Sequence, residues 1–394
     1  MQEQSNSKNI FEHAILERGF RPFFLLGAIY SIISLLIWGG SYAGHITPPT
    51  LMDDPVSWHA HEMIYGYTMA IVAGFLLTAV ANWTGGAPAK QKHLASLCAI
   101  WIAGRLVINF DFGLADIAIL IIDGAFIPAL AISLSIPLIK SWNKRNFIFI
   151  VLLTILFICN IAFYISKERE PLYVAILIIT TMISLIGGRI IPAFTVAALR
   201  RSGVEAFQTP QINMDLAALL SLAFIIIHLT ILGNEGIILA VLGIISSAIH
   251  ILRMRHYHTL KIFNDPMVWI LHAGFSWVII GLILISLSAI DIVPFSMALH
   301  ALTAGAIGSM TLGMICRVAL GHTGRELKAD IATTSIFIAM QISAIFRVFG
   351  TYIFPEYTSL WIVSSTLLWS LCFSIYILVY SAILWKPRIV STRI

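Results

Sequence analysis

Long apolar runs, each close to the length that crosses a bilayer, recur along the whole 394-residue chain. A helix needs about 20 apolar residues to cross the hydrocarbon core. Charged residues make up only 11% of the chain, which is about half the share of a typical soluble domain. The sequence therefore predicts an all-α, polytopic membrane protein with twelve transmembrane helices, near 22–43, 58–82, 94–110, 114–138, 146–165, 171–196, 213–233, 236–252, 266–289, 292–316, 331–354 and 358–385.

Basic residues are distributed unevenly between the loops. The termini and the loops after even-numbered spans hold nineteen of the 24 Lys and Arg residues, whereas the other loops hold two. Cytoplasmic loops carry the excess of Lys and Arg, so both termini are predicted to be cytoplasmic. Residues 1–394 are predicted to form a single membrane domain, with a polar N-terminus at 1–20 and a cytoplasmic tail at 386–394. Because the basic residues lie in separate short loops, no nucleic acid is expected as a partner.

Several imidazoles are predicted to lie inside the membrane. The motif WHAHEM brings His59, His61 and Glu62 to the start of the second span, and His272 and His300 lie in the ninth and tenth. Ionisable groups in a span are costly unless they are paired or hydrated, which makes each a functional candidate. We estimate that His272 and His300 differ in depth by about 9 Å. One large planar cofactor, or two neighbouring centres, could bridge that gap.

The two histidines of WHAHEM are spaced i, i+2, which directs them to nearly opposite sides of a regular helix. They could share one ion only if His59 belongs to an irregular lead-in to the helix. Otherwise they serve different centres, or one of them is structural. The pattern H-x4-G-x7-G occurs twice, at His61, Gly66 and Gly74 and at His300, Gly305 and Gly313.

Three arginines also fall inside predicted spans. Arg189 lies in LIGGRIIPAF, whose glycines and proline predict a weakened or broken helix, and it would suit an anionic group such as a propionate. The alternative is a kinked helix with Arg189 extending to the interface. Arg105 lies near mid-span, where its candidate partners are Glu62, Asp123 and cofactor carboxylates. Arg347 is less deep and is given no role.

Six stretches together resemble the NnrS family: GFRPFFLLG, WHAHEMIYGY, GFLLTAVANWTG, GGRIIPAFT, ILHAGFSW and LHALTAGAIGSMTLGMICRVALGHTGREL. They occur in family order from about residue 18 to residue 350. The resemblance implies a twelve-span protein of the bacterial inner membrane, associated with haem, copper, nitric oxide metabolism and nitrosative stress. The family's polar residues match His59, His61, His272, His300 and His322, and Arg21, Arg105, Arg189, Arg317 and Arg325.

The resemblance and the intramembrane imidazoles together favour a redox enzyme that reduces nitric oxide to nitrous oxide. The absence of a CxxCH motif indicates a non-covalent haem b, with electrons from a quinol or another carrier. His61 is assigned to haem and His59 to copper, while Arg105 or Arg189 would neutralise haem propionates. Glu62 would orient a ligand or relay protons. The alternatives are a haem or copper sensor or handling protein without turnover, and a transporter.

Overall fold

A computed structural model describes residues 10–49, 52 and 54–389, and every regular element within them is helical, which confirms the predicted all-α class. Eleven helices in this part of the chain are long and apolar enough to cross a membrane, so the chain is a multi-pass membrane protein. Residues 1–9 and 390–394, which belong to the predicted polar N-terminus and tail, lie outside the described residues.

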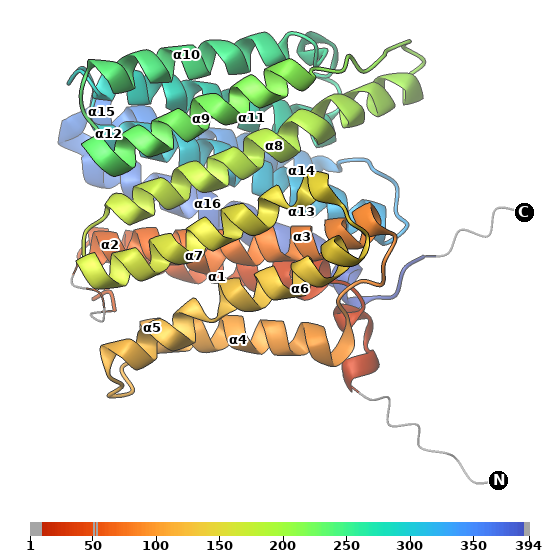
Figure 1. Cartoon of the computed structure of the whole chain (residues 1–394), viewed down its shortest axis with the longest axis horizontal. Coiled ribbons are helices and arrows are strands. Elements are labelled where there is room, and N and C mark those ends of the chain that lie inside the picture. The colour runs from red at the N-terminus through yellow and green to blue at the C-terminus, as the bar shows by residue number, and fades with distance from the viewer. Residues whose placement is uncertain (1–9, 50–51, 53, 390–394) are drawn as a thin grey trace, which may run out of the picture.

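The long helices, and the short helical segments joined to them, run side by side along one axis (Figure 1). In the first half of the chain they are α1 (Phe20–Tyr42), α2 (Pro55–His61), η3 (Glu62–Thr68), α3 (Met69–Thr84), α4 (Gln91–Asn109), α5 (Asp116–Gly124), α6 (Phe126–Lys140), α7 (Ile148–Ser166) and α8 (Glu170–Arg201). In the second half they are α9 (Ile212–Leu232), α10 (Ile237–Met254), α11 (Pro266–Ser288), α12 (Phe295–His300), η6 (Ala301–Ile307), α13 (Gly308–His322), α14 (Ile331–Ile345), η7 (Phe346–Gly350), α15 (Thr351–Ile353) and α16 (Thr358–Trp385).

The helix α4 is the one predicted span that is not among those eleven. It has 19 residues, and it packs against α5 and α6. Both chain ends leave the bundle at the same end (Figure 1), as an even number of crossings requires. This is the arrangement that twelve crossings, with α4 as the twelfth, would give. The count of twelve and the cytoplasmic side of the termini stay predictions.

Helix ends and helix contacts follow from local sequence. Asp54 caps α2, because its carboxylate accepts hydrogen bonds from the backbone N–H groups of Val56 and Ser57 at 2.7 and 2.9 Å. Small residues let membrane helices approach closely. At Gly281 in α11, for example, an added Cβ would lie 3.4 Å from the backbone nitrogen of Leu302 in η6. Buried apolar residues from α1 to α16 form one connected core.

Two helices change to π-helical geometry directly after a histidine. The segment η3 follows His61, the segment η6 follows His300, and each is seven residues long. They coincide with the two copies of the H-x4-G-x7-G pattern, so the sequence similarity is matched by a shared backbone irregularity. Short π-helical segments inside α-helices are frequent at functional sites. The chain thus carries two helices with a π-helical segment of the same length after a histidine, and both helices run in the same direction (Figure 1).

The predicted break in the helix at Arg189 is wrong. The helix α8 is continuous for 32 residues and contains both glycines and Pro192. The glycines serve packing instead: a Cβ on Gly187 would lie 3.1 Å from the ring of Phe275, and one on Gly188 would collide with the guanidinium of Arg253. Arg253, near the end of α10, is buried and pairs with Asp215 at 2.7 Å.

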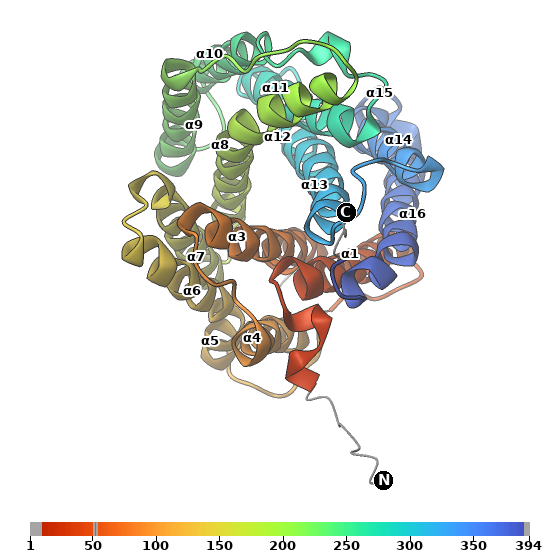
Figure 2. The same cartoon turned by 90° about the vertical axis from the view of Figure 1, so that its right-hand side faces the viewer.

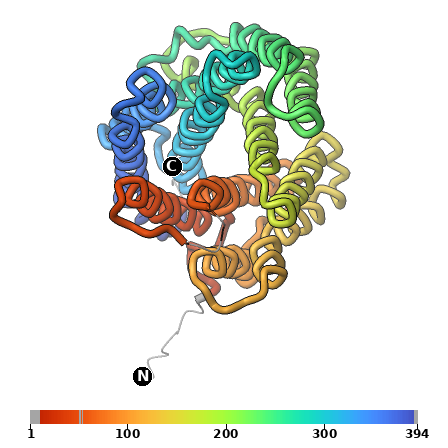
Figure 3. The backbone as a smooth tube through the Cα atoms, turned by 90° about the vertical axis from the view of Figure 1, so that its left-hand side faces the viewer, coloured from red at the N-terminus to blue at the C-terminus, as the bar shows by residue number. Residues whose placement is uncertain are grey.

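End-on views show helices from the two halves of the chain facing each other across the bundle (Figures 2 and 3). The helices α3 and α8 come from the first half, and α13 and α11 from the second. A hydrogen bond of 2.5 Å between the hydroxyls of Tyr67 and Thr311 joins the two π-bulged helices directly. This hydrogen bond brings the helix that carries His59 and His61 into direct contact with the helix that carries His300.

Candidate functional site

A cavity of about 230 Å³ lies toward the end of the bundle opposite the chain termini, where α2, α12 and α15 are found (Figure 1). Residues of α1, α2, η3, α8, α12, η6, η7 and α16 line it. Its wall is mainly apolar and aromatic, with Trp38, Tyr67 and Trp369 among its members. Against this wall stand two imidazoles, those of His59 and His300, and the guanidinium of Arg347. We call this space the histidine cavity.

Each imidazole of the histidine cavity has a ring nitrogen that forms no hydrogen bond with a described residue. His300 Nδ1 donates a hydrogen bond of 2.6 Å to the backbone carbonyl of Ser296, so its Nε2 carries the lone pair. A histidine that binds metal is commonly held in this way through its other nitrogen. The ring of His59 stacks on Trp38, with centroids 4.4 Å apart and planes 13° apart. Its buried Nδ1 has no hydrogen-bond partner among the described residues.

Two cations face the histidine cavity, and they differ in how they are held. Arg169 pairs with Asp54 at 3.1 Å and donates to the hydroxyl of Ser57 at 3.3 Å. The guanidinium of Arg347 makes no ion pair or hydrogen bond with any residue that the structure describes. An unpaired cation inside a membrane is costly. Arg347 is therefore suited to hold an anionic group that enters the cavity.

Asp54 lies outside the spans, at the edge of this cavity. Burial alone would raise the pKa of its carboxyl group, but hydrogen bonds from Ser57 and the Arg169 guanidinium lower that pKa below its ordinary value. The carboxylate therefore stays ionised and holds Arg169 at the cavity edge.

His61 belongs to a different environment, although it is only two residues from His59. Its Nδ1 lies 2.8 Å from Glu62 Oε1, and its Nε2 lies 3.0 Å from Asn160 Oδ1 and 3.2 Å from Asp123 Oδ2. Both ring nitrogens thus face acceptor oxygens of neighbouring side chains. The ring is fully buried, and neither nitrogen is directed into the histidine cavity.

Arg105 completes the polar cluster around His61, because its guanidinium forms ion pairs with both Glu62 and Asp123. Both partners had been expected from the sequence. Gly66 makes room for this contact, because a Cβ there would lie 3.1 Å from the Arg105 guanidinium. The remaining acceptor atoms are also satisfied, by the hydroxyls of Tyr30 and Tyr164 and the amides of Asn109 and Asn160. We call this cluster the charge network.

His272 is buried in a third environment, where each ring nitrogen faces a hydroxyl. Nε2 lies 2.8 Å from Thr195 Oγ1 and Nδ1 lies 3.0 Å from Thr259 Oγ1. Its assignment as a metal or haem ligand stays a prediction, and ligation would require one of these hydrogen bonds to be exchanged.

The expected closeness in depth of His272 and His300 is wrong. Gly281 of α11 packs directly on Leu302 of the antiparallel helix, which sets the register of the two helices. In that register His272 and His300 are about eleven residues apart along the axis, or about 16 Å. The estimate of 9 Å failed because it measured each histidine from an uncertain span end rather than from helix contacts.

Arg189 and His322 meet in a second cavity, of about 200 Å³, at the end of the bundle that carries the termini. Arg189 donates a hydrogen bond of 2.9 Å to Asn146 Oδ1 and is half-buried. The ring of His322 lies 5.6 Å from that of Phe20. The sequence had not linked these two residues, which come from α8 and α13.

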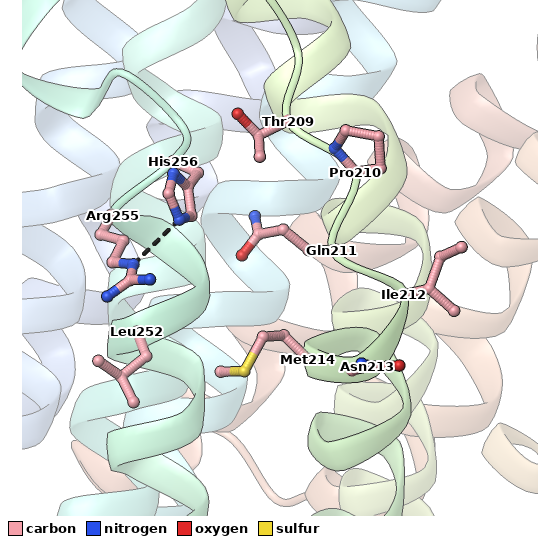
Figure 4. Close-up of a pocket in the computed structure, with 9 residues that line it drawn as sticks. All are labelled: Thr209, Pro210, Gln211, Ile212, Asn213, Met214, Leu252, Arg255 and His256. Carbon is pink, nitrogen blue, oxygen red and sulfur yellow. Dashed lines mark hydrogen bonds between the residues drawn. The ribbon is translucent and has the colours of Figure 1, made fainter.

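The five predicted metal-ligating histidines therefore lie in four places, and only His59 and His300 share one cavity. Within the part of the chain that the structure describes, no group of three or more His, Cys, Asp and Glu side chains is arranged so that it could hold a metal ion. A larger hollow of about 470 Å³ lies where α9 begins and α10 ends, beside Arg255 and His256 (Figure 4). It holds none of the predicted ligands, and Arg255 Nε instead donates to His256 Nε2 at 3.0 Å.

Sequence reasoning missed several members of the site. Asn109, Asn160 and Tyr30 complete the charge network, and Trp38 orients His59. The two asparagines were detectable, because each lies within or at the end of a predicted span, where an amide needs a partner. The stack of Trp38 on His59 joins two different helices, and the sequence carries no signal for it.

A comparison with protein families identifies the chain. The model of the NnrS protein family matches residues 14–388, nearly the entire chain. The chain belongs to the NnrS family. A search of the curated proteins finds no match. Family membership confirms the resemblance found in the sequence motifs, and it places the histidine cavity and the charge network inside a single NnrS unit.

Proposed function

We propose that this NnrS protein binds a haem b in the histidine cavity and there reduces nitric oxide to nitrous oxide in the bacterial inner membrane. The observation that carries the proposal is the meeting of His59 and His300, 241 residues apart in the sequence, in one apolar cavity with an unpaired Arg347. NnrS membership supports a link with nitric oxide, haem and copper.

The donor groups of the cavity fit haem better than a copper ion bound by protein alone. Haem iron needs only one or two axial ligands, and neutral imidazole serves. His300 offers a free Nε2, and Arg347 offers a guanidinium that suits a propionate. The cavity is smaller than the roughly 300–1,000 Å³ usual for organic ligands, so a haem would enter only as lining side chains separate. Copper remains a second proposed cofactor, with His59 or His322 as candidate ligands.

Arg347 takes over the role that the sequence had given to Arg105. Arg105 already neutralises the carboxylates of Glu62 and Asp123, so it has no charge to spare for a propionate. Arg189 keeps its proposed role only for a group in the second cavity, beside His322.

The proposed reaction consumes two nitric oxide molecules, two electrons and two protons, and it yields one nitrous oxide and one water. A quinol, or an external carrier, supplies the electrons. A haem held by His300 and His59 would supply the iron for binding nitric oxide. The Ser296 carbonyl keeps the lone pair of His300 on Nε2, and the Trp38 ring fixes the plane of His59. We propose that Glu62, which Asn109 links toward the end of α4, relays protons.

Purified protein from haem-supplemented cells tests the proposal. We expect a Soret band, protohaem on pyridine extraction, and nitrous oxide by gas chromatography after addition of nitric oxide and a reduced quinol analogue. His300→Gln should lose all three signals, whereas Gln substitution of His93, an exposed residue at the start of α4, should keep them. A Soret band without nitrous oxide would favour the sensor or handling function. Absence of protohaem from the folded wild type would refute the proposal.

A further inference from the structure

Three cavities follow one another along the bundle, from the end that holds the histidine cavity to the end that carries the chain termini. The histidine cavity shares Thr68 and Ile307 with a middle cavity of about 70 Å³. The middle cavity in turn shares residues, Phe75 and Met314 among them, with the cavity that holds Arg189 and His322. The polar residues therefore lie at the two ends of the series, and the middle cavity separates them.

The middle cavity is lined almost entirely by aliphatic and aromatic side chains of α1, α3, α8 and α13 and of the two π-helical segments. Its two hydroxyl groups are already occupied. Thr68 donates to the backbone carbonyl of Met63 at 2.7 Å, and Thr311 donates to that of Ile307 at 2.6 Å while bonding Tyr67. A buried water needs two to four polar partners, and apolar cavities without them stay dry. The walls of the middle cavity therefore offer a water molecule no free polar partner.

We infer that the middle cavity is a binding site for a small uncharged molecule, and that in this protein it holds nitric oxide next to the histidine cavity. Charged and strongly polar solutes are excluded, because they would lose their hydration without gaining a partner. A diatomic gas loses almost no hydration free energy on entering the middle cavity. The shared wall at Thr68 and Ile307 makes this site adjoin the imidazoles.

Such a site would serve the proposed reaction. The identification of the gas as nitric oxide rests on that proposed function. Two nitric oxide molecules must meet for each nitrous oxide formed, and a second molecule stored beside the histidine cavity makes that meeting frequent at low gas concentration. The existence of the site does not depend on turnover. Dry apolar cavities bind xenon, which therefore reports on the site without any chemistry.

Xenon binding to the purified holoprotein tests the inference by 129Xe NMR. Ile183 of α8 lines the middle cavity and is half-buried, so Ile183→Trp should fill it. Ile231→Trp on α9, where the side chain is exposed, is the matched control. We expect the same saturable xenon shift in the wild type and Ile231→Trp, and its loss in Ile183→Trp. Ile183→Ala, which enlarges the cavity and avoids overpacking, should increase the shift.

Steady-state kinetics then distinguish the gas site in the middle cavity from the proposed catalytic function. With the Soret band retained, Ile183→Trp should raise the KM for nitric oxide severalfold and leave kcat nearly unchanged. Saturable xenon binding without nitrous oxide production would keep the cavity and refute the catalytic function. Nitrous oxide production with identical xenon shifts in the wild type and in Ile183→Trp would refute the cavity and keep the catalytic function.

Discussion

His59 and His61 are separated by one residue, yet they belong to two regions with opposite designs. The histidine cavity around His59 is apolar, and its polar groups lack partners: a ring nitrogen of His59, Nε2 of His300 and the guanidinium of Arg347. The charge network around His61 is the reverse. There, two carboxylates, a guanidinium and an imidazole bind one another at full burial.

The difference indicates what each region is for. Buried polar groups in proteins are normally hydrogen-bonded, so a group left without a partner needs an explanation such as a ligand. The histidine cavity meets that condition at both imidazoles and at Arg347, whereas in the charge network Arg105 Nε alone lacks a partner among the described residues. We therefore interpret the network as the internal support of α2, α4, α5 and α7, and the cavity as the site that receives a ligand.

Removing one arginine from each region should give the largest contrast. Arg105→Leu leaves the carboxylates of Glu62 and Asp123 buried without their cation, and breaking such a pair costs about 3–5 kcal/mol. Arg347→Leu removes a cation that has no partner among the described residues, so it should not lower stability. Thermal unfolding of both variants in detergent measures the difference. Equal losses of stability would show that Arg347 is also a structural residue.

Glu62→Gln tests whether the charge network also takes part in the reaction. The amide keeps one acceptor oxygen, for either Tyr30 or Arg105, but it cannot carry a proton. If Glu62 relays protons, nitrous oxide formation should fall about 100-fold or more, with the Soret band unchanged. Wild-type turnover in this variant would leave Glu62 with a structural role only.

Substitution of Asp54, at the edge of the histidine cavity, should have only a small effect on stability. Asp54→Ala removes the N-cap of α2 and the partner of Arg169, and the loss of such a cap costs about 1 kcal/mol. Because the pKa of Asp54 is lowered in the folded protein, its stabilisation is present above the unfolded pKa and is lost as pH falls through the folded value. The difference in stability between this variant and the wild type should thus shrink below about pH 4. A difference independent of pH would show that the carboxylate charge contributes nothing.

The sequence predicted the helices well, because hydropathy and span length follow from the bilayer itself. Every predicted span corresponds to a single helix or to two or three joined helical segments. It also predicted that His59 and His61 point apart, since α2 is regular up to His61. Which of the two would face a cavity could not be predicted. That depends on Trp38 in α1 and on Asp123 and Asn160 in α5 and α7, and periodicity within one helix carries no information about its neighbours.

Cofactor occupancy in glutamine variants of three histidines is the most direct test of the central claim. The claim is that the cofactor binds in the histidine cavity and not in the charge network. Glutamine at His59 or His300 removes a free ring nitrogen, so we predict that each folded variant loses haem or metal. His61→Gln should be less stable but should keep the wild-type Soret band and metal content. Loss of haem from folded His61→Gln, with normal haem in His59→Gln and His300→Gln, would contradict the account.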